Sequence, residues 1–105
     1  MSSMEPVFHA LAEPTRRRLL TRLREEGALS LSELAAPLAI SRQAVTKHLD
    51  VLREASLVEV EWRGRERLHR LDPEPLRVVD EWLAPYAAAW DRRLERLRKH
   101  LEDSE

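Results

Sequence analysis

The sequence predicts a mainly α-helical fold with one small β-hairpin, in the order helix, helix, helix, helix, hairpin, helix. Through most of the chain, apolar residues recur every three or four positions, which is typical of amphipathic helices. Between Leu57 and Leu71 the period changes to two on either side of Gly64. Two alternating runs around a glycine indicate antiparallel strands joined by a turn. We therefore expect about five helices and a two-stranded hairpin.

The composition fits a single domain over residues 1–105, with 43% hydrophobic and 35% charged residues. No apolar run approaches the roughly 20 residues of a membrane span, and the N-terminus has no signal-peptide pattern. The absence of Cys excludes a thiolate metal site and a cysteine nucleophile, and only two Gly are present, which argues against a glycine-rich phosphate loop. We expect a cytoplasmic protein that is not an enzyme and carries no cofactor.

The first two expected helices occupy residues 5–26. Pro6 suits the first turn of a short helix, and a second helix begins after Glu13 with Pro14 at its first position. Gly27 follows the second helix and is expected to end it in a left-handed conformation. The apolar positions of these helices are Val7, Phe8, Ala10 and Leu11, followed by Leu19, Leu20 and Leu23.

Residues 30–54 contain two further helices. Ser30 and Glu33 have the spacing of a capping box, which starts a short helix running to about Leu38. Ser41 caps the next helix, whose narrow apolar face consists of Val45, Leu49 and Leu52. Two short helices joined by a few residues, followed by a hairpin over residues 57–71, match a winged helix-turn-helix.

The last expected helix covers residues 74–102, and Pro85 inside it predicts a kink or a break near Ala84. Its apolar stripe is too long for one small domain to bury alone, so we expect a homodimer built from residues 5–26 and 74–102. The predicted interface residues are Val7, Phe8, Leu11, Trp82, Tyr86, Trp90, Leu94, Leu97 and Leu101.

The helix after Ser41 is the candidate for reading DNA. Its polar side chains include Arg42, which can bind guanine, and Gln43, which can pair with an adenine edge. In the hairpin, three arginines at alternate positions are expected on one side of the ribbon, where they could contact phosphates or a minor groove. The full set of predicted contacts to double-stranded DNA is Ser41, Arg42, Gln43, Thr46, Lys47, His48, Arg63, Arg65 and Arg67.

Blander interpretations of these residues remain open. The net charge is −1, so a DNA surface has to be local, and a solvated helix face or a merely soluble hairpin would show similar charges. A structural hydrogen bond across the helix pair suits His48 better than a phosphate contact does. His69 in the hairpin is expected on the surface. Asp50 is expected at the rim of the DNA groove or paired with Arg53.

In combination, these motifs resemble the arsenic-repressor (ArsR) family of bacterial winged-helix repressors. The resemblance covers nearly the whole chain. It rests on residues 11–20 (LAEPTRRRLL), 31–35 (LSELA), 41–49 (SRQAVTKHL), 51–58 (VLREASLV), 64–67 (GRER) and 71–73 (LDP). It implies a dimer formed by the first and last helices, and repression by occupation of a promoter.

The chain departs from the metal-sensing members of that family. Where they carry a Cys-Val-Cys pair, this chain has Ser30 and Ser32, and hydroxyls bind soft metals poorly. The acid–histidine pattern of zinc-binding members is also missing from the last helix. The chain is therefore similar to the metal-free, autorepressor-like branch with a tryptophan-rich last helix. Ser56 stands where the family usually has Gly, so we expect local strain there.

Two alternative functions remain. The chain could be a winged-helix module that binds a protein rather than DNA, although such a module has little use for the polar face after Ser41. It could also be a repressor that responds to a metal through His9 and His100, or to a small ligand through the aromatic cluster from Trp82 to Trp90. The sequence identifies no effector.

Overall fold

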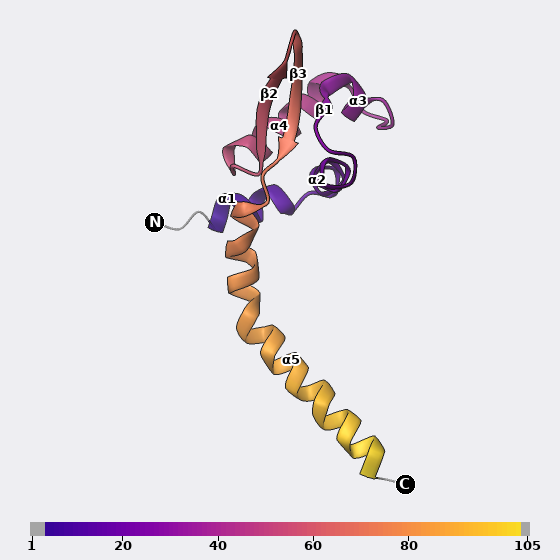
Figure 1. Ribbon diagram of the computed structural model, residues 1–105, viewed down its shortest axis with the longest axis vertical. Coiled ribbons are helices and arrows are strands. Elements are labelled where there is room, and N and C mark those ends of the chain that lie inside the picture. The colour runs from indigo at the N-terminus through magenta and orange to yellow at the C-terminus, as the bar shows by residue number, and fades with distance from the viewer. Residues whose placement is uncertain (1–3, 104–105) are drawn as a thin grey trace.

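The computed structural model describes residues 4–103 and confirms the mainly helical fold with a winged helix-turn-helix order. The α-helices are α1 (Met4–Leu11), α2 (Pro14–Glu26), α3 (Leu31–Ala35), α4 (Arg42–Glu54) and α5 (Arg77–Asp103), with a 3₁₀ turn η1 (Glu74–Leu76) before α5. The strands are β1 (Leu29–Ser30), β2 (Val58–Arg63) and β3 (Glu66–Leu71). Figure 1 shows that α5 extends away from the body formed by the other elements. The ends of the expected 1–105 domain lie outside the described residues.

The predicted boundaries of α2 are confirmed. The Glu13 carboxylate accepts the backbone N–H of Arg16 at 3.1 Å, and Pro14 is the first helical residue. At the other end, the Gly27 N–H donates to the Leu23 carbonyl with φ at +84°. Glycine is the residue that adopts a positive φ at little cost, and this explains why the helix ends there.

Helix α3 starts as predicted but ends at Ala35, three residues earlier than expected. Ser30 and Glu33 form the capping box, with the two hydrogen bonds at 2.9 and 3.2 Å. Pro37 cannot donate the next helical bond to the Glu33 carbonyl because it has no N–H. Arg22 of α2 donates to that carbonyl instead, at 2.8 Å.

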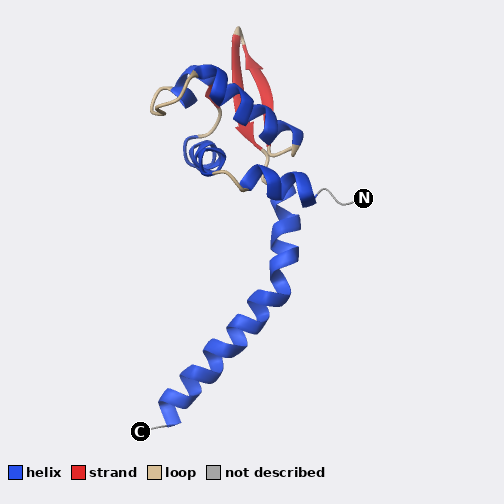
Figure 2. Ribbon diagram, turned by 180° about the vertical axis from the view of Figure 1, so that it is seen from behind, coloured by secondary structure: helices blue, strands red, loops and turns tan. Residues whose placement is uncertain are grey.

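The core is a single cluster contributed by α1 to α4 and the sheet. Figure 2 shows the helices other than α5 gathered near the strands, while α5 extends away from them. The largest fully enclosed side chains of the core are those of Val7, Leu19, Leu34, Val45, Leu49, Leu52 and Leu57. The predicted inward face of α4 is therefore confirmed, and the opposite face of this helix remains exposed to solvent.

Helix α4 ends in a Schellman motif with serine at the left-handed position. The Leu57 N–H donates to the Leu52 carbonyl and the Ser56 N–H to the Arg53 carbonyl, both at 2.9 Å. Leu52 and Leu57 are both buried in the core, which supplies the apolar contact that accompanies this motif. Ser56 has φ at +61° and is the one non-glycine residue with positive φ between residues 4 and 103. This left-handed backbone conformation is the physical source of the strain expected at Ser56.

We expect Ser56→Gly to stabilise the protein by about 0.5–1 kcal/mol, because a side chain makes the left-handed conformation costly. Urea unfolding of both proteins measures the difference. Ser32→Gly is the matched control, since the same change inside α3 should lower stability by about half a kcal/mol. A lower unfolding midpoint for Ser56→Gly than for the wild type would contradict the strain assignment.

The expected two-stranded hairpin is present as β2 and β3, and a short third strand extends it to a sheet in the order β1-β3-β2. β1 pairs antiparallel with β3, with Leu29 opposite His69 and Ser30 opposite Leu68. Ser30 therefore has two roles, since it ends a strand of the sheet and also caps α3. This residue joins the base of the wing directly to the helix-turn-helix.

Helix α5 is 27 residues long and none of its residues is buried. Pro85 lies inside it without breaking it, and Figure 1 shows that the helix axis changes direction along its length. The break that the sequence left open does not occur. Within residues 4–103, no helix is both long enough and apolar enough to cross a membrane.

Candidate nucleic-acid interface

The outer face of α4 presents five predicted DNA contacts to solvent. Ser41, Arg42, Gln43, Thr46 and Lys47 are all exposed. The Ser41 hydroxyl accepts the Ala44 N–H at 3.1 Å and so caps the helix. The side chains of the other four make no hydrogen bond or ion pair with the described part of the chain. They are therefore available to an external partner.

The wing arginines are exposed but do not share one side of the ribbon, so this prediction was wrong. Directly paired residues of a hairpin point to the same face. The two-residue turn at Gly64 and Arg65 pairs Arg63 with Glu66 and Trp62 with Arg67. Arg63 and Arg67 consequently lie on opposite faces. A single DNA surface can therefore contact Arg65 at the tip together with either Arg63 or Arg67, but not with both.

His69 is buried, with 3% of its surface exposed, so its predicted surface position was also wrong. It lies on the central strand, with Leu29 on one side and Val60 on the other. Its Nδ1 is buried without a hydrogen-bond partner in the described structure. Burial lowers the pKa of His69, helped by the charges of Arg67 and Arg53, while a hydrogen bond to the Leu29 backbone and the charge of Asp50 oppose the shift.

The lowered pKa of His69 predicts an acid-sensitive fold. Below about pH 6.5 the unfolded chain takes up a proton at this residue that the folded chain takes up only at lower pH. The free energy of unfolding should therefore fall as the pH drops from 7.5 to 5.5, by at most about 1.4 kcal/mol per pH unit from this one group. Urea unfolding at both pH values should show a smaller loss for His69→Leu than for the wild type. His9→Leu, at an exposed histidine, should lose as much as the wild type; equal losses in all three proteins would contradict the assignment.

His48 is half-buried and hydrogen-bonded to Arg16, a residue for which the sequence predicts no role. Its Nδ1 lies 3.3 Å from Arg16 Nη1 and 3.7 Å from Glu13 Oε2. Arg16 is 9% exposed, and it also donates to the backbone carbonyls of His9 and Ala10. One signal could have revealed it. Arg16 lies three, four and seven residues before the leucines of α2, on the same stripe.

A continuous apolar stripe on α5 coincides with most of the predicted dimer interface. Its members are between 47 and 61% exposed: Trp82, Tyr86, Trp90, Leu94, Leu97 and Leu101. Phe8 of α1 meets Trp82 edge to face, with 5.7 Å between the ring centroids. Leu11 packs partly against the core. Val7 is fully buried within the chain, and its predicted place in the interface is corrected.

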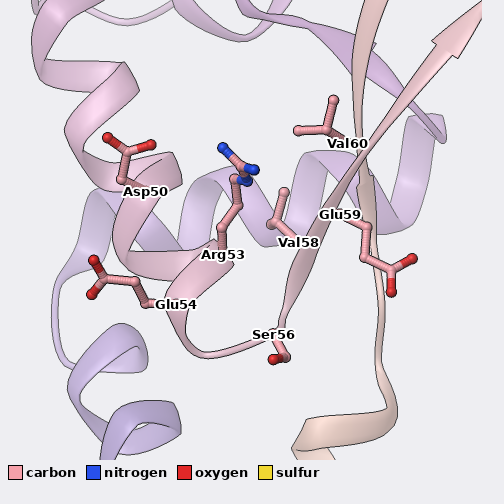
Figure 3. Close-up of a pocket in the computed structure, with 7 residues that line it drawn as sticks. All are labelled: Asp50, Arg53, Glu54, Ser56, Val58, Glu59 and Val60. Atoms are coloured by element: carbon pink, nitrogen blue, oxygen red, sulfur yellow. The ribbon is translucent and has the colours of Figure 1, made fainter.

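A groove of about 740 Å³ lies between the C-terminal half of α4 and β2 (Figure 3). Its lining includes three carboxylates, from Asp50, Glu54 and Glu59, and one guanidinium, from Arg53. This charge balance is unsuited to phosphate. Asp50 and Arg53 do not form the ion pair that the sequence suggested as one possibility, since no such contact occurs in the described residues.

The residues considered for metal binding are dispersed. Ser30 is engaged in capping α3. His9 lies on α1, which packs near the start of α5, whereas His100 lies near the C-terminal end of α5 (Figure 1). Within residues 4–103, no three His, Cys, Asp or Glu side chains come together as a metal site would require.

Comparison with known proteins gives consistent results. A family described as a helix-turn-helix domain matches residues 11–61. The HTH-type transcriptional regulator YuzN of Bacillus subtilis is 39% identical, over 75% of this chain and 94% of its own length. The arsenic resistance transcriptional regulator ArsR1 of Pseudomonas putida is 35% identical, over 77% and 72%. The structure of an ArsR-like transcriptional regulator from Rhodococcus sp. RHA1 superposes with a TM-score of 0.70 and 39% identity, over 92% of this chain and 91% of that one.

Proposed function

Because this chain belongs to the ArsR family of helix-turn-helix transcriptional regulators, and so binds double-stranded DNA, we propose that it is a repressor acting as a homodimer on a pseudo-palindromic operator. Its relatives are regulators and not enzymes. In the proposed complex, each subunit places α4 in a major groove and the wing beside it. Half-sites would then be about one helical turn apart or a multiple of this.

One observation above all supports the DNA-reading role: Arg42, Gln43, Thr46 and Lys47 are exposed and their side chains have no partner within residues 4–103, while the opposite face of α4 is buried in the core. Arg42 and Gln43 stand at the N-terminal end of the helix, the end that reaches base edges in helix-turn-helix complexes. Lys47 and Arg65 are suited to phosphates. Ser41, Thr46, His48, Arg63 and Arg67 complete the proposed contacts.

Binding to duplex DNA distinguishes this proposal from a protein-binding module. We expect the protein to protect a two-fold symmetric segment in a footprint of the DNA upstream of its own gene. Its affinity for random duplex should fall steeply with salt, because phosphate contacts release counterions. A protein-binding module would give neither protection nor a salt slope, and that result would overturn the proposed function.

We further propose that repression is independent of metals, since the sequence contains no Cys and no cluster of acidic and histidine side chains occurs within residues 4–103. Operator affinity should therefore be the same with zinc, nickel or arsenite at one equivalent per site as with a chelator. Fluorescence anisotropy with a labelled operator measures this directly. A tenfold loss of affinity with any of the three would contradict the metal-free proposal and direct attention to His9 and His100 from different subunits.

A further inference from the structure

The buried Arg16 side chain connects three elements. Its Nε donates to the Ala10 carbonyl at 2.8 Å and its Nη2 donates to the His9 carbonyl at 3.0 Å. Both carbonyls belong to the last turn of α1, where the negative end of the helix favours a cation. The remaining terminal nitrogen, Nη1, faces His48 on α4. Arg16 thus ties the recognition helix to α1, and α1 contacts α5 through Phe8 and Trp82.

This contact determines where the proton of the His48 ring lies. A guanidinium can only donate hydrogen bonds, so Nδ1 of His48 has to accept the bond from Arg16 and cannot carry a proton. The Glu13 carboxylate is the other group that could interact with Nδ1. Its Oε2 is 3.7 Å from Nδ1, beyond hydrogen-bond range, and accepts the backbone N–H of Arg16. With Nδ1 as the acceptor, the N–H of the ring lies on Nε2.

Nε2 is left as a hydrogen-bond donor without a partner in residues 4–103. The side chain of His48 is 22% exposed, so the ring is reachable from solvent. The preceding residue, Lys47, lies on the exposed face of α4, about 100° around the helix from His48. A single N–H that is held in one orientation and reaches solvent suits a phosphate oxygen.

We propose that Arg16 is a positioning residue for DNA binding: it holds His48 in the Nε2-protonated form, and this N–H donates to a backbone phosphate of the duplex. The proposal rests on the proposed function, because it assumes that α4 lies against DNA. It adds a contact that carries no base information, and it makes that contact depend on a buried residue of α2. The docking of α1 thereby sets the orientation of a group on the DNA-facing helix.

Two replacements of His48 separate the two ring nitrogens. Asparagine offers an acceptor near the position of Nδ1 but has no group at Nε2, whereas glutamine can place an N–H near Nε2. We expect His48→Asn in the full chain to weaken binding by about tenfold or more per subunit, the value of one hydrogen bond to a charged group, on operator and random duplex alike. His48→Gln should stay within about twofold of the wild type. His100→Asn, the same change at an exposed site on α5, should have no effect.

Long-range ¹⁵N NMR of the free protein tests the positioning role independently of DNA. The wild type should show unprotonated Nδ1 and protonated Nε2 at His48, and Arg16→Gln should lose this preference. Because Arg16 is buried and its removal also costs stability, the decisive binding comparison is the one between the two His48 variants.

Each other outcome overturns the inference. A protonated Nδ1 in the wild type excludes the Arg16 contact. Unchanged binding by His48→Asn, or equal losses by His48→Asn and His48→Gln, excludes the Nε2 donor. A loss confined to the operator means that His48 reads a base and not a phosphate. If the wild type binds no duplex at all, the proposed function fails as well, which distinguishes that failure from those in which DNA binding persists.

Discussion

Replacing Leu94 and Leu97 by glutamate in the same chain is expected to yield monomers that bind the operator at least a hundredfold more weakly than the wild type. Both leucines belong to the α5 stripe, in which no residue is buried within one chain. Burying a leucine side chain contributes about 1.5–3 kcal/mol, and enclosing a carboxylate in an apolar interface costs more than that gain. A two-fold dimer carries each change twice. Sedimentation at micromolar concentration and operator titration measure the two effects.

Ala84→Glu together with Ala88→Glu is the matched control for this experiment. Both alanines are exposed on α5, and the helical repeat places them on the side away from the stripe. This variant adds the same charge and should remain dimeric. The dimer proposal fails if the wild-type chain itself sediments as a monomer at micromolar concentration.

Substitutions on α4 and in the wing are expected to fail in different ways. Arg42→Ala or Gln43→Ala should cost about 1–3 kcal/mol at the operator and little on random duplex, because base contacts carry the sequence preference. Arg65→Ala should weaken binding to both about equally. It should also lower the salt slope by about one unit per half-site, since phosphate contacts are blind to sequence. Titrations of both duplexes at several salt concentrations give all of these quantities.

Val45→Ala is the control that separates folding from recognition. Val45 belongs to the buried face of α4 and is fully enclosed, so its truncation should lower stability before it alters specificity. If Arg42→Ala and Gln43→Ala leave the ratio of operator to random binding unchanged, α4 does not read the major groove.

Features of this molecule that depend on neighbouring residues could be predicted from the sequence. The caps at Ser30 and Ser41 and the inward face of α4 follow from short spacings, and the structure contains them. The resemblance to the family, which usually has Gly at this position, predicts strain at Ser56, and its φ is positive. For the two caps, the backbone N–H that the serine hydroxyl accepts lies three positions along the chain.

Features that depend on distant pairing could not be predicted in this way. β1 has two residues, too few for a period, and exists because it pairs with β3. The surface position expected for His69 assumed a strand with one solvent face, but the successive residues Leu68 and His69, which point to opposite faces of β3, are both buried. The two-residue turn at Gly64 and Arg65 sets the pairing of the strands, and this pairing puts Arg63 and Arg67 on opposite faces of the hairpin. The role of Arg16 depends on carbonyls six and seven residues away and on a histidine 32 positions further on.

The double role of Ser30 has a mechanical consequence for the proposed complex with DNA. Because the same residue ends β1 and caps α3, the hairpin cannot swing without disturbing the start of the helix-turn-helix. The base of the wing is therefore tied to the start of the helix-turn-helix. Since contacts from both the wing and α4 favour duplex of one local twist, we expect occupancy of the operator to depend on the supercoiling of the template as well as on its base sequence.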